Sequence, residues 1–397
     1  MISALGMNTT ELRASTGLAI IFFLRMLGLF LILPVFVLYA KGLTDATPTL
    51  IGIAFGIYGL TQALFQIPFG MLSDRIGRKP VITVGLAIFA LGSVIAGSAD
   101  SIWIVICGRI LQGSGAIAAA VMALAADLTH EAQRSKTMAF IGMSIGIAFA
   151  LAFVIGPMLT PVIGVPGLFY LSSVLAIIAI FLLFSLVPTP LSHIFHDETE
   201  ASIQKLYNVL CNKKLIPLYL SIFTLHMLLM ASFLVIPVAL RDVAGLATGQ
   251  HWHVYLPVFI ISVVIMFPFI VYGEKYKKVK YIFEGAIIIM ILSQTGFLLA
   301  HDSIQQIFIM LVIFFTAFNY LEATLPSLIT KLSAPSQKGT ALGIFSSSQF
   351  LGTFVGGLTG GYCYDHFDIS GVFLLGAVIA VCWLIFTFNM PPLTKGN

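Results

Sequence analysis

This chain contains few charged residues. Asp, Glu, Lys and Arg together make up 9% of its 397 residues, whereas soluble globular proteins carry about 25%. Hydrophobic residues make up 59% of the sequence. This composition excludes an ordinary soluble domain and predicts an integral membrane protein.

The chain also lacks the patterns of several function classes. Its four cysteines have no paired spacing, so we expect no disulfide or metal framework. It has no G-x-x-x-x-G-K-[ST] sequence, so ATP is not the expected energy source. It has no continuous basic patch with interleaved aromatic residues, so its net charge of +4 does not indicate nucleic-acid binding. No Ser/His/Asp, Cys/His or His-rich arrangement converges on one side of the membrane, so we expect neither an enzyme nor a bound cofactor.

Long apolar runs take the place of these features. Each run is near the roughly 17 to 25 residues that a helix needs to cross a bilayer. The runs are apolar on all sides, which favours helices over the alternating pattern of a membrane β-barrel. The predicted fold is an all-α membrane protein of twelve transmembrane helices. We place the spans near residues 16–39, 48–72, 80–98, 101–128, 136–160, 166–187, 216–240, 251–272, 279–300, 303–330, 338–362 and 369–390.

Basic residues are unevenly sorted in this topology. With the amino terminus inside, sixteen of the twenty Lys and Arg residues lie in cytoplasmic segments. Lys41 and Arg241 lie on the other side, and Arg25 and Arg109 lie within spans. Because short cytoplasmic loops hold an excess of Lys and Arg, the sequence predicts that both termini are cytoplasmic.

A polar stretch divides the spans six and six. It predicts an amino-terminal bundle (residues 1–188), a cytoplasmic linker (189–214) and a carboxy-terminal bundle (215–397). Within the linker, apolar residues recur at helical spacing at 203, 206, 207 and 210. Either a short helix on the membrane surface or a loosely ordered linker fits this spacing.

The two halves repeat each other. Leu24-Arg25-Met26-Leu27 is matched 201 residues later by Leu225-His226-Met227-Leu228. A degraded copy of the charged segment at 70–80 begins at Gly273. Repeats of this kind are typical of transporters that bind substrate near the bilayer midplane.

Three segments resemble a known family. Residues 70–80 read Gly-Met-Leu-Ser-Asp-Arg-Ile-Gly-Arg-Lys-Pro between the second and third spans, and residues 109–115 read Arg-Ile-Leu-Gln-Gly-Ser-Gly in the fourth. The fifth span carries Gly142, Gly146 and Gly156-Pro157. These motifs resemble those of the major facilitator superfamily, in particular its twelve-span drug:proton antiporter branch. The resemblance implies two pseudo-symmetric six-helix bundles in a bacterial inner membrane, a monomer, a small-molecule substrate and a proton gradient as the energy source.

The segment at 70–80 is a candidate conformational latch. Gly70 offers a bare helix end for close approach and Gly77 a tight turn. Arg78 needs an acidic partner, and Asp127 at the cytoplasmic end of the fourth span is the obvious one, a pairing that the resemblance also implies. The hypothesis is a latch that holds the halves in the outward-open state. The alternative is that the loop only fixes topology by its positive charge. The predicted latch residues are Gly70, Asp74, Arg75, Gly77, Arg78 and Asp127.

Charged and titratable residues deep in spans are candidates for proton coupling. A charge in the membrane interior is costly and is by default a functional candidate. Glu322 is the deepest acid, and His226 can change charge near neutral pH. The resemblance implies a role in proton coupling for Arg109. The alternative is that the histidine and the arginine are packed polar residues with structural roles.

A second group is predicted to line the substrate cavity. Tyr58, Gln62 and Gln66 recur at i, i+4 and i+8 and form one polar stripe on an apolar helix. Arg25 lies in the first span, and Asn319 shares a helical face with Glu322. Arg25 in place of an acid in the first span favours neutral, zwitterionic or anionic cargo.

The leading hypothesis is proton-coupled efflux of small molecules by alternating access. Uptake by the same fold is the alternative within transporters. A non-transporting membrane sensor is the alternative outside them, although the short loops leave little to signal through.

Overall fold

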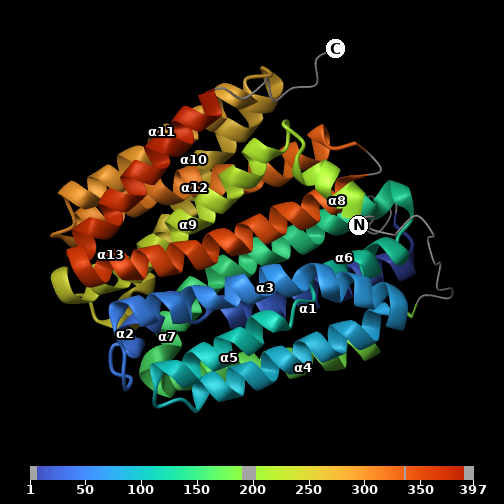
Figure 1. Ribbon diagram of the computed structural model, residues 1–397, viewed down its shortest axis with the longest axis horizontal. Coiled ribbons are helices and arrows are strands. Elements are labelled where there is room, and N and C mark those ends of the chain that lie inside the picture. The colour runs from blue at the N-terminus through green and yellow to red at the C-terminus, as the bar shows by residue number, and fades with distance from the viewer. Residues whose placement is uncertain (1–6, 190–202, 335–336, 389–397) are drawn as a thin grey trace. The chain divides into compact units, whose positions relative to one another are not determined.

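The computed structural model describes residues 7–189, 203–334 and 337–388, and their regular structure is helical (Figure 1). The elements are α1 (Thr9–Phe30), α2 (Phe36–Ala40), α3 (Pro48–Ile76), α4 (Arg78–Gly97), α5 (Ile102–Ser114), α6 (Ala118–Asp127), α7 (Glu131–Ser185), α8 (Ile203–Leu210), α9 (Ile216–Val238), the π-helical turn η3 (Ala239–Val243), the 3-10 turn η4 (Thr248–Gln250), α10 (Trp252–Lys275), α11 (Val279–Leu299), α12 (Ile304–Leu332) and α13 (Lys338–Phe388).

Among the described residues, ten helical segments are long and apolar enough to cross a membrane. Two of these segments lie in α7 and α13, which contain 55 and 51 residues. Each of these helices is interrupted by a residue with positive φ, Gly164 at 68° and Asp368 at 57°. Both interruptions fall between predicted spans, so each long helix supplies two crossings. The predicted all-α class with twelve spans is confirmed.

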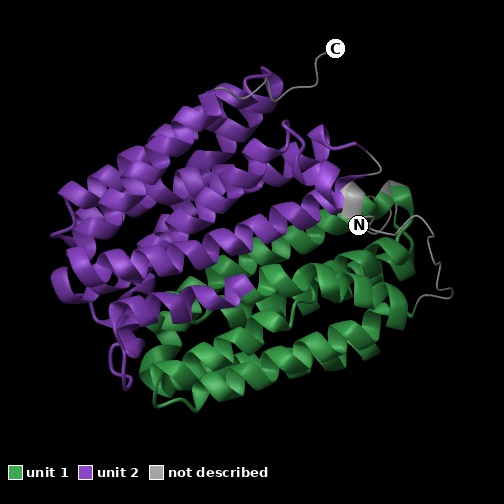
Figure 2. Ribbon diagram, in the orientation of Figure 1, with its two compact units in different colours: residues 1–36, 61–199 green, residues 37–60, 200–397 purple. Residues whose placement is uncertain are grey.

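The chain divides into two compact units (Figure 2). Unit 1 comprises residues 1–36 and 61–199, and unit 2 comprises residues 37–60 and 200–397. Helix α3 therefore contributes its first part to unit 2 and its second part to unit 1. The predicted division at 189–214 stays a prediction, and residues 190–202 of it lie outside the described part of the chain.

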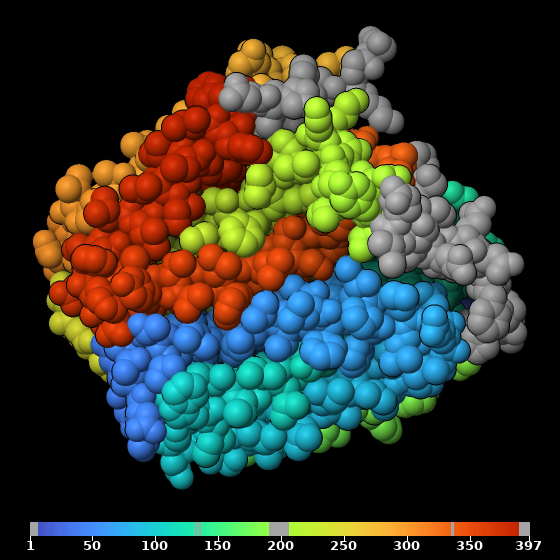
Figure 3. All heavy atoms as spheres, viewed as in Figure 1, coloured from blue at the N-terminus to red at the C-terminus, as the bar shows by residue number. Residues whose placement is uncertain are grey.

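In unit 1, α7 packs against α1 and α4, and α4 packs against α5. Fully buried rings of Phe89, Phe153 and Phe169 fill its core. The outer face of α4 is apolar instead of polar, with Val84 and Leu91 51% and 56% exposed. Atoms of α4 form part of the surface in the space-filling view (Figure 3). An exposed apolar face of this kind is expected where a helix meets lipid.

In unit 2, α9 is the central helix. Buried residues make up 83% of its apolar window, compared with 28% for α10. Helix α13 packs on α9, and α11 packs on both α12 and α13. Helix α10 is peripheral, and its exposed Ile260, Val264 and Phe267 recur at i, i+4 and i+7. This pattern indicates one continuous lipid-facing stripe.

One local prediction is wrong, and one predicted span contains a break that was not predicted. We expected the second span to end near residue 72 with Gly70 at a bare helix end, but α3 stays helical to Ile76. Arg75 in its last turn complements the helix dipole, which explains why the charged residues do not end the helix. The predicted fourth span is present as Ile102–Asp127, but it contains a break, because α5 ends at Ser114 and α6 begins at Ala118.

Of the two alternatives for the linker, the structure shows the helical one at its carboxy-terminal end. Helix α8 covers Ile203–Leu210. Its Tyr207 and Leu210 are 60% and 48% exposed, whereas Val209 is buried. The apolar residues predicted to face a membrane surface thus include two that are exposed.

Candidate functional site

The loop between α3 and α4 consists of one residue. Gly77 adopts φ 99° and ψ 152°, a conformation that residues with a side chain rarely adopt. It ends α3 and allows α4 to start at Arg78. The tight turn predicted for Gly77 is confirmed.

Arg78 is the centre of a charged cluster in unit 1. Its Nε donates to Asp127 Oδ2 at 3.0 Å, and its guanidinium pairs with the Asp74 carboxylate one turn earlier. Its Nη1 also donates to Ser73 Oγ at 2.8 Å, and that hydroxyl donates to the Gly70 carbonyl at 2.7 Å. Five residues of α3, α4 and α6 are thus joined through one guanidinium.

The other basic residues of this segment lie differently. Arg75 is exposed at the end of α3. Lys79 Nζ donates to the Val187 carbonyl at 2.7 Å and lies over the Phe184 ring at 5.8 Å from its centroid. Lys79 therefore ties the start of α4 to the end of α7, where a cation is favoured by the helix dipole.

Arg25 is the largest fully buried polar side chain of unit 1. It is 0% exposed, and its Nη2 donates to Gln62 Oε1 at 2.8 Å and to the Gly115 carbonyl at 3.0 Å. Gln62 in turn donates to Gln66 Oε1 at 3.4 Å. Gly115 lies at the break between α5 and α6, so Arg25 satisfies a carbonyl that the interrupted helix has released.

Replacement of Arg25 by lysine is expected to destabilise the protein. An ammonium on a flexible stem cannot reproduce the guanidinium fork, so a buried amide or carbonyl loses its charge-assisted hydrogen bond, which is worth about 1.5 to 3 kcal/mol. The midpoint of thermal unfolding in detergent should fall by several degrees.

Arg13→Lys is the matched control, because Arg13 also donates to a carbonyl, that of Ser185 at 2.8 Å, but at an exposed position. A smaller fall is expected for it. Equal midpoints for the two variants would contradict the role given to Arg25.

Arg109 belongs to a second buried chain of hydrogen bonds in unit 1. Its Nη1 donates to Gln112 Oε1 at 2.9 Å, Gln112 Nε2 donates to Ser93 Oγ at 2.7 Å, and Ser93 donates to the Phe89 carbonyl at 2.8 Å. The Phe89 ring also lies 5.6 Å from the Arg25 guanidinium. Both intramembrane arginines are therefore connected to Phe89 of α4, Arg25 through its ring and Arg109 through Gln112 and Ser93.

In unit 2 three helices bring two titratable groups together. Glu322 of α12 has Oε2 3.8 Å from Nε2 of His226 in α9. Gln349 of α13 places its Nε2 2.8 Å from His226 Nε2 and 3.3 Å from Glu322 Oε1. The Glu322 side chain is 36% exposed, although Leu321 and Leu325 beside it are fully buried.

The hydrogen bonds of this cluster fix the tautomer of His226. Gln349 Nε2 is a donor, so His226 Nε2 and Glu322 Oε1 must accept from it. His226 then carries its proton on Nδ1, which donates to the Ile222 carbonyl at 3.3 Å. The arrangement fits a neutral histidine beside a carboxylate. A proton added on His226 Nε2 or Glu322 Oε1 would require the Gln349 amide to turn and offer its oxygen.

Gln349 is not among the predicted site residues. The only signal in the sequence is a polar residue in an apolar span, and such a residue can equally form an interhelical hydrogen bond. Asn319, which the sequence placed with Glu322, instead donates to Ser262 Oγ of α10 at 3.0 Å.

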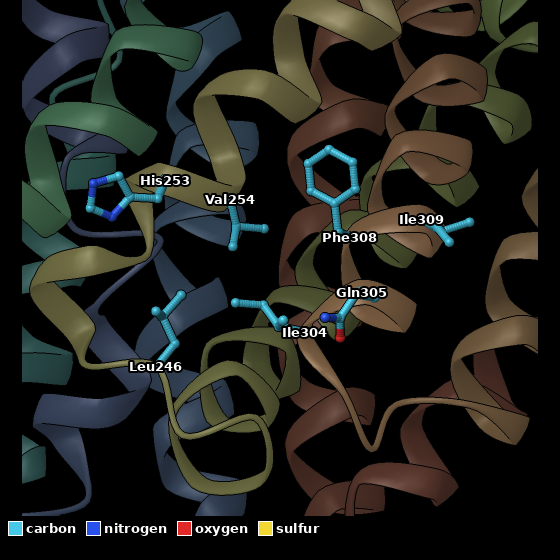
Figure 4. A pocket seen from close by; sticks show the side chains of 7 residues that line it. All are labelled: Leu246, His253, Val254, Ile304, Gln305, Phe308 and Ile309. Atoms are coloured by element: carbon cyan, nitrogen blue, oxygen red, sulfur yellow. The ribbon is translucent and has the colours of Figure 1, made fainter.

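The predicted cavity residues do not all lie in one unit. Tyr58 belongs to unit 2, where its ring lies edge-on to Phe350 at 6.2 Å, whereas Gln62 and Gln66 belong to unit 1. A pocket of about 450 Å³ lies elsewhere in unit 2 (Figure 4). Its lining is His253, Gln305 and five apolar side chains from the starts of α10 and α12 and the preceding loop. The cavity predicted from the sequence stays a prediction.

A polar cluster forms where the first part of α3 joins unit 2. Thr49 donates to Asp365 Oδ2 of α13 at 2.6 Å. Lys41 and Arg241, the two basic residues predicted outside the cytoplasm, both pair with Asp242, at 3.5 and 2.6 Å. Sequence reasoning did not foresee that these isolated cations share one carboxylate.

Comparisons with known proteins agree with this fold. A family model described as Major Facilitator Superfamily matches residues 18–321 and 258–397. The inner membrane transport protein YajR of Escherichia coli K12 is 48% identical over 388 residues, which cover 97% of this chain and 85% of YajR. The multidrug resistance protein MdtH of Aeromonas hydrophila is 24% identical over 359 residues, covering 88% of this chain and 87% of MdtH.

Among solved structures, a D-xylose-proton symporter superposes with a TM-score of 0.78 at 15% identity, covering 98% of this chain and all of that one. This likeness shows the fold. The match of the family model to most of the chain and the identity with YajR show the family. The chain is a secondary active transporter of the Major Facilitator Superfamily.

Proposed function

We propose that this transporter exports small molecules in exchange for protons, by alternating access. The observation that carries the proposal is the cluster of Glu322, His226 and Gln349. An acidic side chain that is partly exposed within an apolar membrane helix needs a water-accessible cavity. Such a group can bind and release a proton as access to it alternates.

Exchange instead of co-transport is supported by the resemblance of α7 to antiporters. Gly142 and Gly146 of that motif leave open space, since a Cβ at either would have no neighbour within 4 Å. Gly156 lies directly against the Leu31 carbonyl of α1. The name of the relative MdtH, a multidrug resistance protein, also favours efflux.

In this proposal the cluster of Asp74, Arg78 and Asp127 is the latch that holds the outward-open state, with both termini cytoplasmic. Its support is the single guanidinium that pairs with both carboxylates. Because these groups are only partly buried, at 18% to 36% exposure, their pairing is weak enough to break and reform in each cycle.

The direction of coupling is tested in liposomes that contain a pH indicator. A thermal-shift screen of drugs, sugars and amino acids first identifies a ligand, which is then loaded into the vesicles. As the ligand leaves, antiport brings protons in and acidifies the lumen, whereas uptake-type symport carries protons out and makes the lumen alkaline. The sign does not depend on how the protein is oriented. Alkalinisation would establish the symport alternative, and ligand release without a pH change would contradict proton coupling.

A further inference from the structure

Glu11 is a buried carboxylate at the start of the chain's first span. It lies in the first turn of α1 and is 4% exposed. Its Oε2 accepts from the Asn8 N–H at 2.9 Å, and the Asn8 side chain accepts from the Glu11 N–H at 2.8 Å. This reciprocal capping box explains why α1 begins at Thr9.

The same carboxylate also caps a second helix. Its Oε1 accepts from the His130 N–H at 2.9 Å, and His130 is the N-cap residue of α7. The His130 side chain makes no capping bond of its own. Because helix N-termini favour negative charge, Glu11 stabilises the starts of two helices that are 119 residues apart in sequence.

The turn held by Glu11 carries Asp127 of the proposed latch. Asp127 is the last residue of α6, and His130 follows three positions later. The two residues between them are anchored to α6: Leu128 N–H and Thr129 Oγ1 donate to its carbonyls at 3.1 and 2.7 Å. Glu11 therefore fixes the far end of a turn whose near end is Asp127.

From this geometry we infer that Glu11 is a positioning residue for the latch. It keeps Asp127 where the Arg78 guanidinium can reach it, without touching either side chain. The inference rests on the proposed latch and adds to it a residue from α1, so that the first turn of α1 and the latch are mechanically linked.

Glu11→Gln tests the inference, because the two N–H groups bond to different carboxylate oxygens and glutamine offers a single oxygen in their place. The measured quantity is the distance distribution between spin labels at Trp103 and Phe367, two exposed positions in units 1 and 2 of a cysteine-free protein. We expect Asp127→Asn to shift the ratio of the short-distance to the long-distance population. Glu11→Gln should shift this ratio in the same direction by about tenfold, the lower end of the effect of losing a charge-assisted hydrogen bond. In the double variant Glu11→Gln should add nothing.

Two further variants separate positioning from helix capping. Asn8→Ala weakens the start of α1 but leaves the bond to His130, so it should leave the ratio unchanged. His130→Pro removes the donor N–H at a residue whose φ of −62° suits proline, so it should reproduce the effect of Glu11→Gln even if that variant folds poorly.

The outcomes distinguish this inference from the latch itself. If Asp127→Asn shifts nothing, the latch is wrong and the inference falls with it. Suppose that Asp127→Asn shifts the ratio but Glu11→Gln does not, or that Glu11→Gln shifts the ratio by the same factor whether or not Asp127→Asn is also present. In either case Glu11 is a structural cap, and only this inference is overturned.

Discussion

Glu322→Gln is expected to abolish proton-driven transport while leaving ligand exchange intact. Glutamine keeps the size of the side chain and its hydrogen bond to Gln349, but it cannot bind or release a proton. Transport driven by a pH gradient should fall to the rate of protein-free liposomes. Exchange of labelled for unlabelled ligand at equal pH needs no proton turnover and should continue. Both rates are measured in the same reconstituted preparation.

Glu284→Gln is the matched control, since it neutralises another acid of unit 2. Glu284 lies in α11 and pairs with Lys280 of its own helix at 3.7 Å. It makes none of the contacts that join Glu322, His226 and Gln349. It should retain proton-driven transport. If Glu322→Gln transports as the unaltered protein does, with the same pH change, the proton carrier is another group. If both rates fall together, Glu322 is needed for substrate binding and not for coupling alone.

Much of this cluster is predictable because intramembrane polarity is visible in the sequence. Glu322 and His226 stand out in apolar spans, and the cost of burying them makes them candidates without any coordinates. Their pairing is not predictable, because it depends on how α9, α12 and α13 pack. The same limit explains Gln349, which resembles any glutamine that joins two helices until the structure places it 2.8 Å from His226.

In the fold, too, the features set by local sequence are predictable, and those set by contacts between distant helices are not. The number of spans follows from hydropathy, and the sharp turn follows from Gly77. The break in the fourth span does not, because glycines are tolerated in membrane helices. It depends on Arg25 of α1, which supplies the donor for the released Gly115 carbonyl at 3.0 Å. Likewise, hydropathy cannot show that the first part of α3 packs with unit 2, since that depends on glycines of α13 far along the chain.

Gly357→Val is expected to stop transport by separating α3 from α13. A Cβ at Gly357 would lie 2.5 Å from the Gly52 carbonyl oxygen and 3.0 Å from the Gly56 Cα. These neighbours are backbone atoms, so no side chain can turn away to make room. The two helices must move apart, which also breaks the bond between Thr49 and Asp365. Any state of the cycle that uses this contact is then lost, and transport should fall to background, with Gly357→Ala intermediate.

Gly285→Val tests whether the effect is specific to this contact. Gly285 lies in α11 of the same unit, and a Cβ there would have no neighbour within 4 Å. Transport should therefore persist.

Cross-linking with a short thiol reagent between cysteines placed at Thr49 and Asp365 reports the contact directly. Gly357→Val should strongly reduce the yield of cross-linked protein. Wild-type transport by a Gly357→Val protein that no longer cross-links would mean that the cycle does not need this contact. Loss of transport with cross-linking intact would place the defect elsewhere. The expected pair of losses, absent in Gly285→Val, would make the approach of α3 to α13 a required step of transport.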